Sequence, residues 1–170
     1  TGHMRCWEQV FPNTKETILD RYNPDVFIHA WDDQAWWDPH SREGFVANSP
    51  KIEIDKIREV YKPTAMVFEN FEPKRADFEK HAEQYEKHYH VKRNILSMFY
   101  KIGRGVDMMN EHTARTGKHY DFVIRMRPDM IFNEDLPEFD PQRFYTLAHR
   151  NHLGQGTGDM IQVGNQFNMM

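Results

Sequence analysis

The sequence is poor in cysteine, since Cys6 is the only one. A single thiol cannot form a disulfide within the chain, and it cannot build a zinc site from several thiolates. This scarcity favours a reducing, cytoplasmic setting. The sequence also lacks an apolar run of about 18 to 20 residues, the length that spans a bilayer, and no signal-peptide pattern opens it. We therefore expect a cytoplasmic protein with no transmembrane segment.

An excess of basic charge is also missing. The 22 Lys and Arg residues are scattered and are outnumbered by 26 Asp and Glu residues, so the electrostatic footprint of a nucleic-acid-binding protein is absent. We expect no nucleic-acid partner. Hydrophobic residues make up 39% of the 170 positions, which suffices for a buried core. The length predicts a single domain over residues 1–170.

The order of apolar runs predicts alternating helices and strands. Apolar residues recur every three or four positions from Ile95 to Met109, which is typical of a helix, whereas short apolar runs between turn-forming residues indicate buried strands. The charged stretch 74–90 is either a solvated helix or a poorly packed insertion. We expect helices over residues 14–21, 52–60 and 95–109, and strands over 25–30, 65–68, 120–127, 143–147 and 160–163.

Turn-forming residues mark the boundaries of these elements. Pro12 and Asn13 suit the start of the first helix, and Gly117 suits a C-terminal helix cap. Residues 32–50 predict a long loop, and the Gly-rich residues 154–158 predict a shorter one. The alternation predicts an α/β fold in which helices flank a mostly parallel, doubly wound sheet.

The strand predicted at 120–127 places charged residues on one face. Alternation directs Phe122, Ile124 and Met126 to one side, and Val123, Arg125, Arg127 and Asp129 to the other. Open α/β sheets bind ligands at the carboxyl ends of their strands. Arginine donors and a divalent cation held by Asp129 would neutralise a diphosphate there. The alternative is a salt bridge between Arg125 and Asp129 that has no catalytic role.

Residues 120–129, Tyr-Asp-Phe-Val-Ile-Arg-Met-Arg-Pro-Asp, resemble the YDxVIRxRxD segment of bacterial and viral sugar transferases that build capsules and lipopolysaccharide. The resemblance implies a nucleotide-sugar-dependent glycosyltransferase with a GT-A-like, Rossmann-type fold. It names neither the donor nor the acceptor, because related enzymes vary both. Four further segments resemble the same family in the same order: 1–5 (its SGQxR loop), 25–33, 94–101 and 158–164.

The resemblance also implies roles for residues near the N-terminus. In the family the SGQxR loop follows the first strand and touches the nucleotide, so Gly2 and Arg5 are expected to bind the nucleotide-sugar. We expect residues 1–170 to lack that first strand and the C-terminal end of the family's domain. The alternative is that Gly2, His3 and Met4 are a cloning scar.

The metal motif departs from the usual pattern of GT-A enzymes, which is Asp-x-Asp. This chain has Arg127-Pro128-Asp129, with one carboxylate in place of two. A metal-assisted mechanism with Mn²⁺ or Mg²⁺ at Asp129 is therefore a hypothesis. Asp32 and Asp33 would add a second carboxylate, or they lie in a solvated loop.

Two further groups are candidates for the site. Asp159 follows the Gly-rich segment and is expected to act as general base beside the acceptor hydroxyl, or else to cap a turn. His152 is another residue that would lie near the acceptor. Asn94, Ser97 and Lys101 share one helix face and are candidates for binding the nucleotide-sugar, or else they face water.

These observations predict an enzyme that moves a sugar from a nucleotide-sugar donor to a glycan or polysaccharide acceptor. Catalysis would come from positioning and from charge stabilisation at the leaving diphosphate, with Asp129 and Asp159 as the catalytic residues. Two alternatives remain open. One is a non-catalytic sugar- or nucleotide-binding module, and the other is a metal-dependent phosphate-ester hydrolase.

Overall fold

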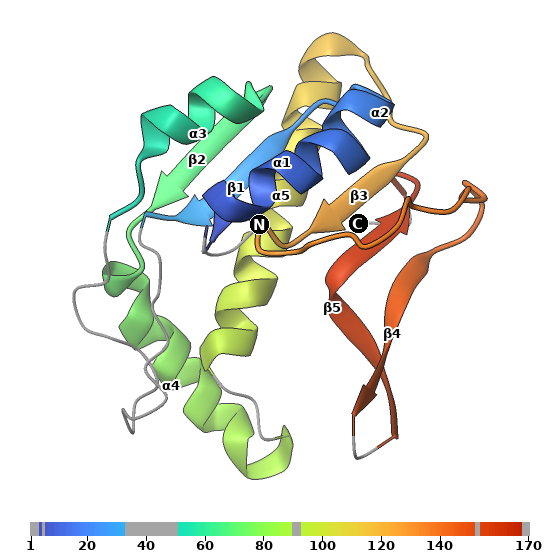
Figure 1. Ribbon diagram of the computed structural model, residues 1–170. Coiled ribbons are helices and arrows are strands. Elements are labelled where there is room, and N and C mark those ends of the chain that lie inside the picture. Colours follow the sequence, from blue (N-terminus) through green and yellow to red (C-terminus); the bar gives the residue numbers. More distant parts are fainter. Residues whose placement is uncertain (1–3, 5, 33–50, 90–92, 152–153, 168–170) are drawn as a thin grey trace.

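A computed structural model describes residues 4, 6–32, 51–89, 93–151 and 154–167 (Figure 1). Its helical elements are α1 (Trp7–Thr14), the π-helix η1 (Lys15–Leu19), α2 (Asp20–Tyr22), α3 (Ile54–Tyr61), α4 (Glu72–Tyr89) and α5 (Arg93–Thr116). Its strands are β1 (Phe27–Trp31), β2 (Ala65–Glu69), β3 (Val123–Met126), β4 (Tyr145–Asn151) and β5 (Gly154–Gly164).

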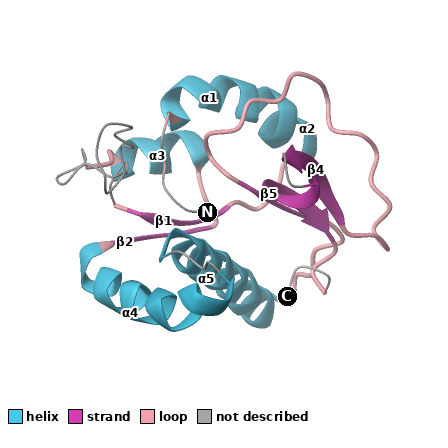
Figure 2. Cartoon of the chain, turned by 90° about the horizontal axis from the view of Figure 1, so that it is seen from below, coloured by secondary structure: helices cyan, strands magenta, loops and turns pink. Residues whose placement is uncertain are grey.

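The N-terminal half is built on a parallel pair of strands. β1 and β2 pair from Phe27 opposite Ala65 to Trp31 opposite Glu69. Figure 2 shows α1 and α3 on one face of this pair and α4 and α5 on the other. Parallel strands need a crossover connection, and α3 lies in the segment that joins β1 to β2. The prediction of parallel strands flanked by helices is confirmed for this half.

Alternation along β1 explains how its two faces are buried. Ile28 and Ala30 enter a core with Trp7 and Ile57, which come from the helices on the first face. His29 and Trp31 point to the opposite face and are also buried. Because both faces are covered, the strand is a nearly continuous buried run, as the sequence predicted.

The C-terminal strands form a second sheet in the order β3-β5-β4, and both pairs are antiparallel. The prediction of a mostly parallel sheet is therefore wrong for this half. The predicted Gly-rich loop at 154–158 is also wrong, because these residues belong to β5. β4 and β5 are longer than predicted and leave only residues 152–153 between them. A short connection permits antiparallel pairing, whereas a parallel pair needs about a dozen residues or more.

Two helices are longer than the sequence predicted. The first helix begins at Trp7, so the predicted start near Pro12 is wrong, and Pro12 lies inside α1. The turn ahead of the proline is helical, and its residues Trp7 and Val10 are buried. The segment 72–89 forms the helix α4, so of the two alternatives for this charged stretch the helix is confirmed. α5 extends from Arg93 to Thr116 and ends at Gly117, whose φ of 73° confirms the predicted cap.

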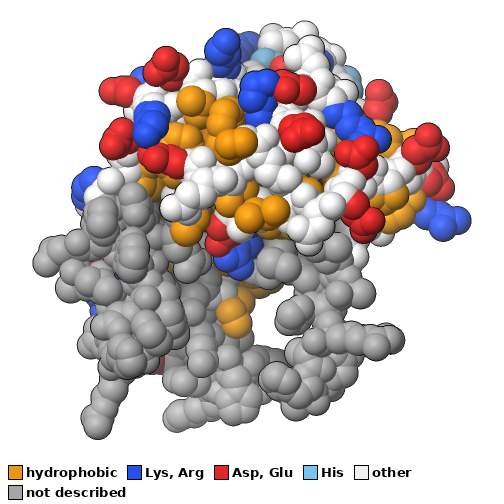
Figure 3. All heavy atoms as spheres, in the orientation of Figure 1, with side chains coloured by type: hydrophobic (Ala, Val, Ile, Leu, Met, Phe, Trp, Pro, Cys, Tyr) orange, Lys and Arg blue, Asp and Glu red, His pale blue; other side chains and the backbone are white. Residues whose placement is uncertain are grey.

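The described chain is therefore a mixed α/β structure with a small parallel sheet, flanking helices and a separate antiparallel sheet. A Rossmann-type, GT-A-like arrangement remains a prediction, as does the division of residues 1–170 into one domain. Acidic and basic side chains are intermixed on the face shown in Figure 3. Each described helix is too short or too polar to cross a bilayer.

Candidate functional site

The end of β3 joins a guanidinium group to a carboxylate. Arg127 Nε lies 2.9 Å from Asp129 Oδ1, and its Nη2 lies 2.7 Å from Oδ2, so the two side chains form a bidentate ion pair. The structure thus binds the carboxylate of Asp129 to Arg127, and the alternative of a salt bridge between Arg125 and Asp129 stays a prediction. Such a fork holds the plane of the guanidinium in one orientation.

The predicted alternation along β3 is confirmed. Ile124 and Met126 contact the C-terminal core around Met130, Ile161 and Val163. Arg125 lies on the other face, is buried, and borders a cavity of about 860 Å³ between β3 and β1. Arg127 follows the end of β3, so its place on the same face as Arg125 stays a prediction.

The described residues do not fit a site for Mn²⁺ or Mg²⁺. Both oxygens of Asp129 are bound by Arg127, and Asp32 Oδ2 lies 2.7 Å from Lys51 Nζ. Within the described ranges, no group of three His, Cys, Asp or Glu residues is placed to hold a metal. Asp33 lies outside those ranges. A divalent cation at Asp129 remains a prediction, and no chemistry below is assigned to it.

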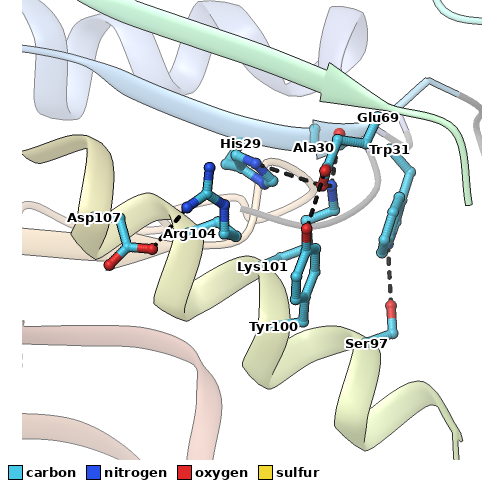
Figure 4. Close-up of polar contacts among 9 residues, drawn as sticks. All are labelled: His29, Ala30, Trp31, Glu69, Ser97, Tyr100, Lys101, Arg104 and Asp107. Carbon is cyan, nitrogen blue, oxygen red and sulfur yellow. Dashed lines mark hydrogen bonds and ion pairs between the residues drawn. The ribbon is translucent and has the colours of Figure 1, made fainter. Parts of the chain in front are cut away.

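A second polar cluster lies between α5 and the β1–β2 pair (Figure 4). Lys101 is 1% exposed, and its Nζ lies 2.8 Å from Glu69 Oε2 and 3.1 Å from the carbonyl oxygen of Ala30. The same Nζ lies 3.5 Å from the centre of the Trp31 ring. The Tyr100 hydroxyl donates to Glu69 Oε1 at 3.0 Å. A buried cation thus has a carboxylate, a carbonyl and an aromatic face as partners.

The environment of this cluster changes the pKa values of three groups. Burial lowers the pKa of Lys101 to about 8, although the hydrogen bond to Glu69 acts in the opposite direction. Burial and the charge of Lys101 lower the pKa of His29 to about 4. Burial alone would raise the pKa of Glu69, but the hydrogen bond and charge of Lys101 keep it below its ordinary value. At neutral pH the cluster therefore contains a lysine cation, a glutamate anion and a neutral histidine.

His29 lies at the edge of the charge pair. Its Nε2 is 3.5 Å from Glu69 Oε2, and neither ring nitrogen has a hydrogen-bond partner within the described part of the chain. The ring is 0% exposed. A buried imidazole without a partner is held neutral, because protonation would place a second cation beside Lys101.

Ser97 and Lys101 lie on one face of α5, as predicted, but this face points inward. The Trp31 indole Nε1 donates to Ser97 Oγ at 3.0 Å, and both residues are buried. The alternative in which these groups face water is therefore wrong for Ser97 and Lys101. Their polar atoms already bind interior partners, which favours a role in positioning β1 and β2. Direct contact with a nucleotide-sugar remains a prediction.

Other predicted site residues cannot be placed by their side chains. Gly2, Arg5 and His152 lie outside the described residues. Asn94 belongs to α5 and Asp159 to β5, but their side chains lie outside the described part. Asp159 lies inside a strand and not at its start, so the premise of a preceding turn is wrong.

Sequence reasoning missed Glu69, His29 and Tyr100. Glu69 is the last residue of β2, at the carboxyl end of a predicted strand, where a carboxylate is a recognisable signal. His29 interrupts an apolar strand, which also marks a polar group held in the interior. Tyr100 had no distinguishing signal beside the apolar stripe of α5.

The cluster around Lys101 contains residues of β1 and β2, whereas the ion pair at Asp129 follows β3.

Comparison of the chain with protein-family models, curated proteins and solved structures found no match. The resemblance to sugar transferases therefore depends on the motifs of the sequence alone.

Proposed function

We propose that this protein transfers a sugar from a nucleotide-sugar donor to a glycan or polysaccharide acceptor. The observation that carries the proposal is the charged end of β3, where Asp129 holds the guanidinium of Arg127 directly after the strand. The resemblance of residues 120–129 to sugar transferases supports the same assignment. A GT-A-like fold and a cytoplasmic setting are parts of this proposal.

The chemistry that β3 supports is stabilisation of a leaving diphosphate. As the bond between the sugar and the diphosphate of the donor breaks, negative charge grows on the phosphate oxygens. A guanidinium with fixed orientation binds that charge at little entropic cost. In this proposal Arg127 binds the diphosphate and Asp129 orients Arg127. Asp159 remains the predicted general base for the acceptor hydroxyl.

Titration calorimetry with UDP and GDP, with and without Mn²⁺, tests the proposal. Arg127→Lys keeps the charge but removes the fork, so we expect it to weaken nucleotide binding at least about tenfold. Arg143→Lys is the matched control, because Arg143 is exposed and pairs with Asp140 at 3.3 Å. We expect the control to bind like the wild-type protein.

Three outcomes would contradict parts of the proposal. Absence of heat with every nucleotide would favour the binding module, and unchanged affinity in Arg127→Lys would remove the assigned role of that residue. Release of free sugar from the donor in the absence of acceptor would favour a hydrolase. Binding that requires Mn²⁺ would instead support the metal prediction at Asp129.

A further inference from the structure

Asn13 joins the first helix to the segment that follows β3. Its side-chain amide donates to the carbonyl oxygen of Phe132 at 2.9 Å, and its Oδ1 accepts from the Phe132 N–H at 2.7 Å. The two residues are 119 positions apart in the sequence, and both are partly buried. An amide side chain offers an acceptor and two donors, so it can bind both backbone groups of one residue, as a neighbouring strand does.

Helix propensity does not explain an asparagine at this position. Asn13 lies inside α1, one residue before its end, and α1 continues directly into η1. Asparagine is unfavourable in a helix interior, because its side chain competes for nearby backbone groups. Here the side chain binds the backbone of a distant segment instead. Asn13 therefore has a tertiary role that a better helix former could not fill.

A short extended stretch connects Phe132 to Asp129. Residues 128 and 129 form a turn directly after β3. Met130 is buried in the C-terminal core, Ile131 is exposed, and Phe132 packs against the same core as Met130. This alternation is typical of an extended chain, so the backbone position at Phe132 determines where Asp129 lies.

The hydrogen bonds from Asn13 supply what apolar packing does not. Contacts with the core hold the Phe132 side chain, but apolar contacts are not directional. Hydrogen bonds to both backbone groups of Phe132 fix the orientation of the chain at that residue. A shift there moves the carboxylate of Asp129, which binds Arg127 through hydrogen bonds of 2.9 and 2.7 Å.

We infer that Asn13 is a positioning residue for the ion pair between Arg127 and Asp129. It fixes the backbone at Phe132, this backbone places the Asp129 carboxylate, and the carboxylate orients the guanidinium of Arg127. The consequence for nucleotide binding rests on the proposed function, in which Arg127 binds the leaving diphosphate. The consequence for the ion pair itself does not.

A second contact between the first helices and the same segment provides a matched control. Arg21 Nη1 lies 2.9 Å from Asp135 Oδ2, but these side chains are 40% and 79% exposed. An exposed ion pair contributes little to stability, and this one joins side chains without binding the backbone of the segment. Asp135→Ala therefore removes a contact of the same segment while leaving the hydrogen bonds of Asn13 in place.

Hydrogen exchange of the Arg127 Nε–H, followed by nuclear magnetic resonance, tests the effect on the ion pair. Asn13→Leu removes both hydrogen bonds to Phe132 but keeps a similar size and favours the helix. We expect the Nε–H to exchange at least about tenfold faster in this variant, because it leaves Asp129 more often. Asn13→Asp keeps the acceptor but not the donor, and it should also exchange faster. Asp135→Ala should exchange like the wild-type protein.

Titration calorimetry with UDP and GDP tests the effect on the proposed site. We expect Asn13→Leu to bind at least about tenfold more weakly than the wild-type protein, and Asp135→Ala to bind equally well. The double variant Asn13→Leu with Arg127→Lys should bind no more weakly than Arg127→Lys alone, because both changes act through one guanidinium. A merely structural role of Asn13 would instead make the two losses add.

The outcomes separate this inference from the proposed function. Unchanged exchange of the Arg127 Nε–H in Asn13→Leu, equally fast exchange in Asp135→Ala, or additive losses in the double variant would overturn the inference. Equal nucleotide affinity of Asn13→Leu and the wild-type protein would also overturn it, and would leave the proposed function intact. If the wild-type protein binds no nucleotide but Asn13→Leu still releases the Nε–H, the proposed function fails and the positioning of the ion pair stands.

Discussion

Lys101 has an environment that is unusual for a lysine. A lysine that is 1% exposed loses its hydration, and here it regains partners in Glu69, the Ala30 carbonyl and the Trp31 ring. These partners come from β1 and β2, whereas Lys101 comes from α5. The contacts therefore join the helix to both strands of the parallel pair, and they fix one packing of α5.

Removing the charge of Lys101 should be costly. In Lys101→Met the side chain keeps its volume, but Glu69 loses its cation, so we expect the free energy of unfolding to fall by about 2 kcal/mol or more. The cost lies below that of fully buried pairs, because the Glu69 side chain is 25% exposed. Urea unfolding followed by tryptophan fluorescence measures it.

The double variant Lys101→Met with Glu69→Gln is the informative control for this pair. Since it removes both charges, we expect it to be more stable than Lys101→Met alone. Lys15→Met, which breaks the exposed pair with Asp20, should change stability by less than about 1 kcal/mol. Equal losses in Lys15→Met and Lys101→Met would contradict a special role for the buried pair.

His29 should make stability depend on pH. Its pKa in the folded protein is about 4, below the ordinary value of 6.5, so the unfolded chain binds a proton first as the pH falls. The free energy of unfolding should therefore decrease from pH 6.5 toward pH 4, by up to about 3 kcal/mol in total. Urea unfolding at a series of pH values measures this slope.

His29→Gln is the matched variant, because it keeps a polar side chain but cannot titrate. Between pH 6.5 and 5, above the range where carboxylates gain protons, its stability should depend less steeply on pH than that of the wild-type protein. Identical slopes for the two proteins would show that His29 binds a proton equally in both states.

At the scale of secondary structure, α3 ends in a backbone conformation that its sequence does not favour. Lys62 follows the helix with φ 44° and ψ 52°, its N–H donates to the Arg58 carbonyl at 3.1 Å, and Pro63 comes next. Residues with a Cβ atom enter this left-handed region at a cost, whereas the following proline disfavours only the right-handed helical region for Lys62. The two elements that this turn joins, α3 and β2, pack into one core.

Lys62→Gly should stabilise the protein. Glycine adopts the left-handed conformation without a steric penalty, and we expect a gain of up to about 1 kcal/mol after its greater freedom in the unfolded chain is subtracted. Lys62→Ala is the control, because it removes the same side chain but keeps Cβ. A thermal unfolding series that ranks alanine above glycine would contradict the argument.

At the scale of the whole molecule, Asp25 links the two sheets. Its carboxylate is 2.6 Å from Lys118 Nζ, 2.7 Å from the Tyr120 hydroxyl and 3.3 Å from Thr64 Oγ1. The hydrogen bonds from Lys118 and Tyr120 keep the pKa of Asp25 below its ordinary value. This contribution to stability is therefore present near neutral pH and is lost as the pH falls below about 4.

Asp25→Ala should weaken the connection between the halves. It leaves the Tyr120 hydroxyl and Lys118 without this acceptor, so we expect the free energy of unfolding to fall by about 1 to 3 kcal/mol. Asp135→Ala is the control, since Asp135 joins Arg21 across the same two halves but is 79% exposed. If both variants unfold at the same urea concentration, Asp25 has no particular role.

Local signals predicted much of the helical structure. The apolar stripe between Ile95 and Met109 located α5, and Gly117 located its end, because both depend on the helical repeat and on backbone sterics. The apolar runs at 25–30 and 65–68 located the parallel pair. Alternation along β3 also placed Ile124 and Met126 on one face, since side-chain direction in a strand follows from position alone.

Other features depended on contacts between distant residues. Which strand pairs with β3, and in which direction, is decided by the whole sheet, so the antiparallel order was missed. The partners of Lys101 lie 71 and 32 residues away along the chain, at Ala30 and Glu69. The same polar stripe on a helix could face water or a buried carboxylate, and only the packed structure distinguishes these cases.

The sequence by itself determined the central part of α5, which residues form the parallel pair and which side chains of β3 face the core, because periodicity and turn chemistry act over a few residues. The tertiary structure decided that Lys101 and Ser97 are interior, that Asp129 binds Arg127, and that a cavity separates β1 from β3. Burial, charge pairing and strand order depend on contacts between residues that are distant in the sequence, so local patterns do not determine them.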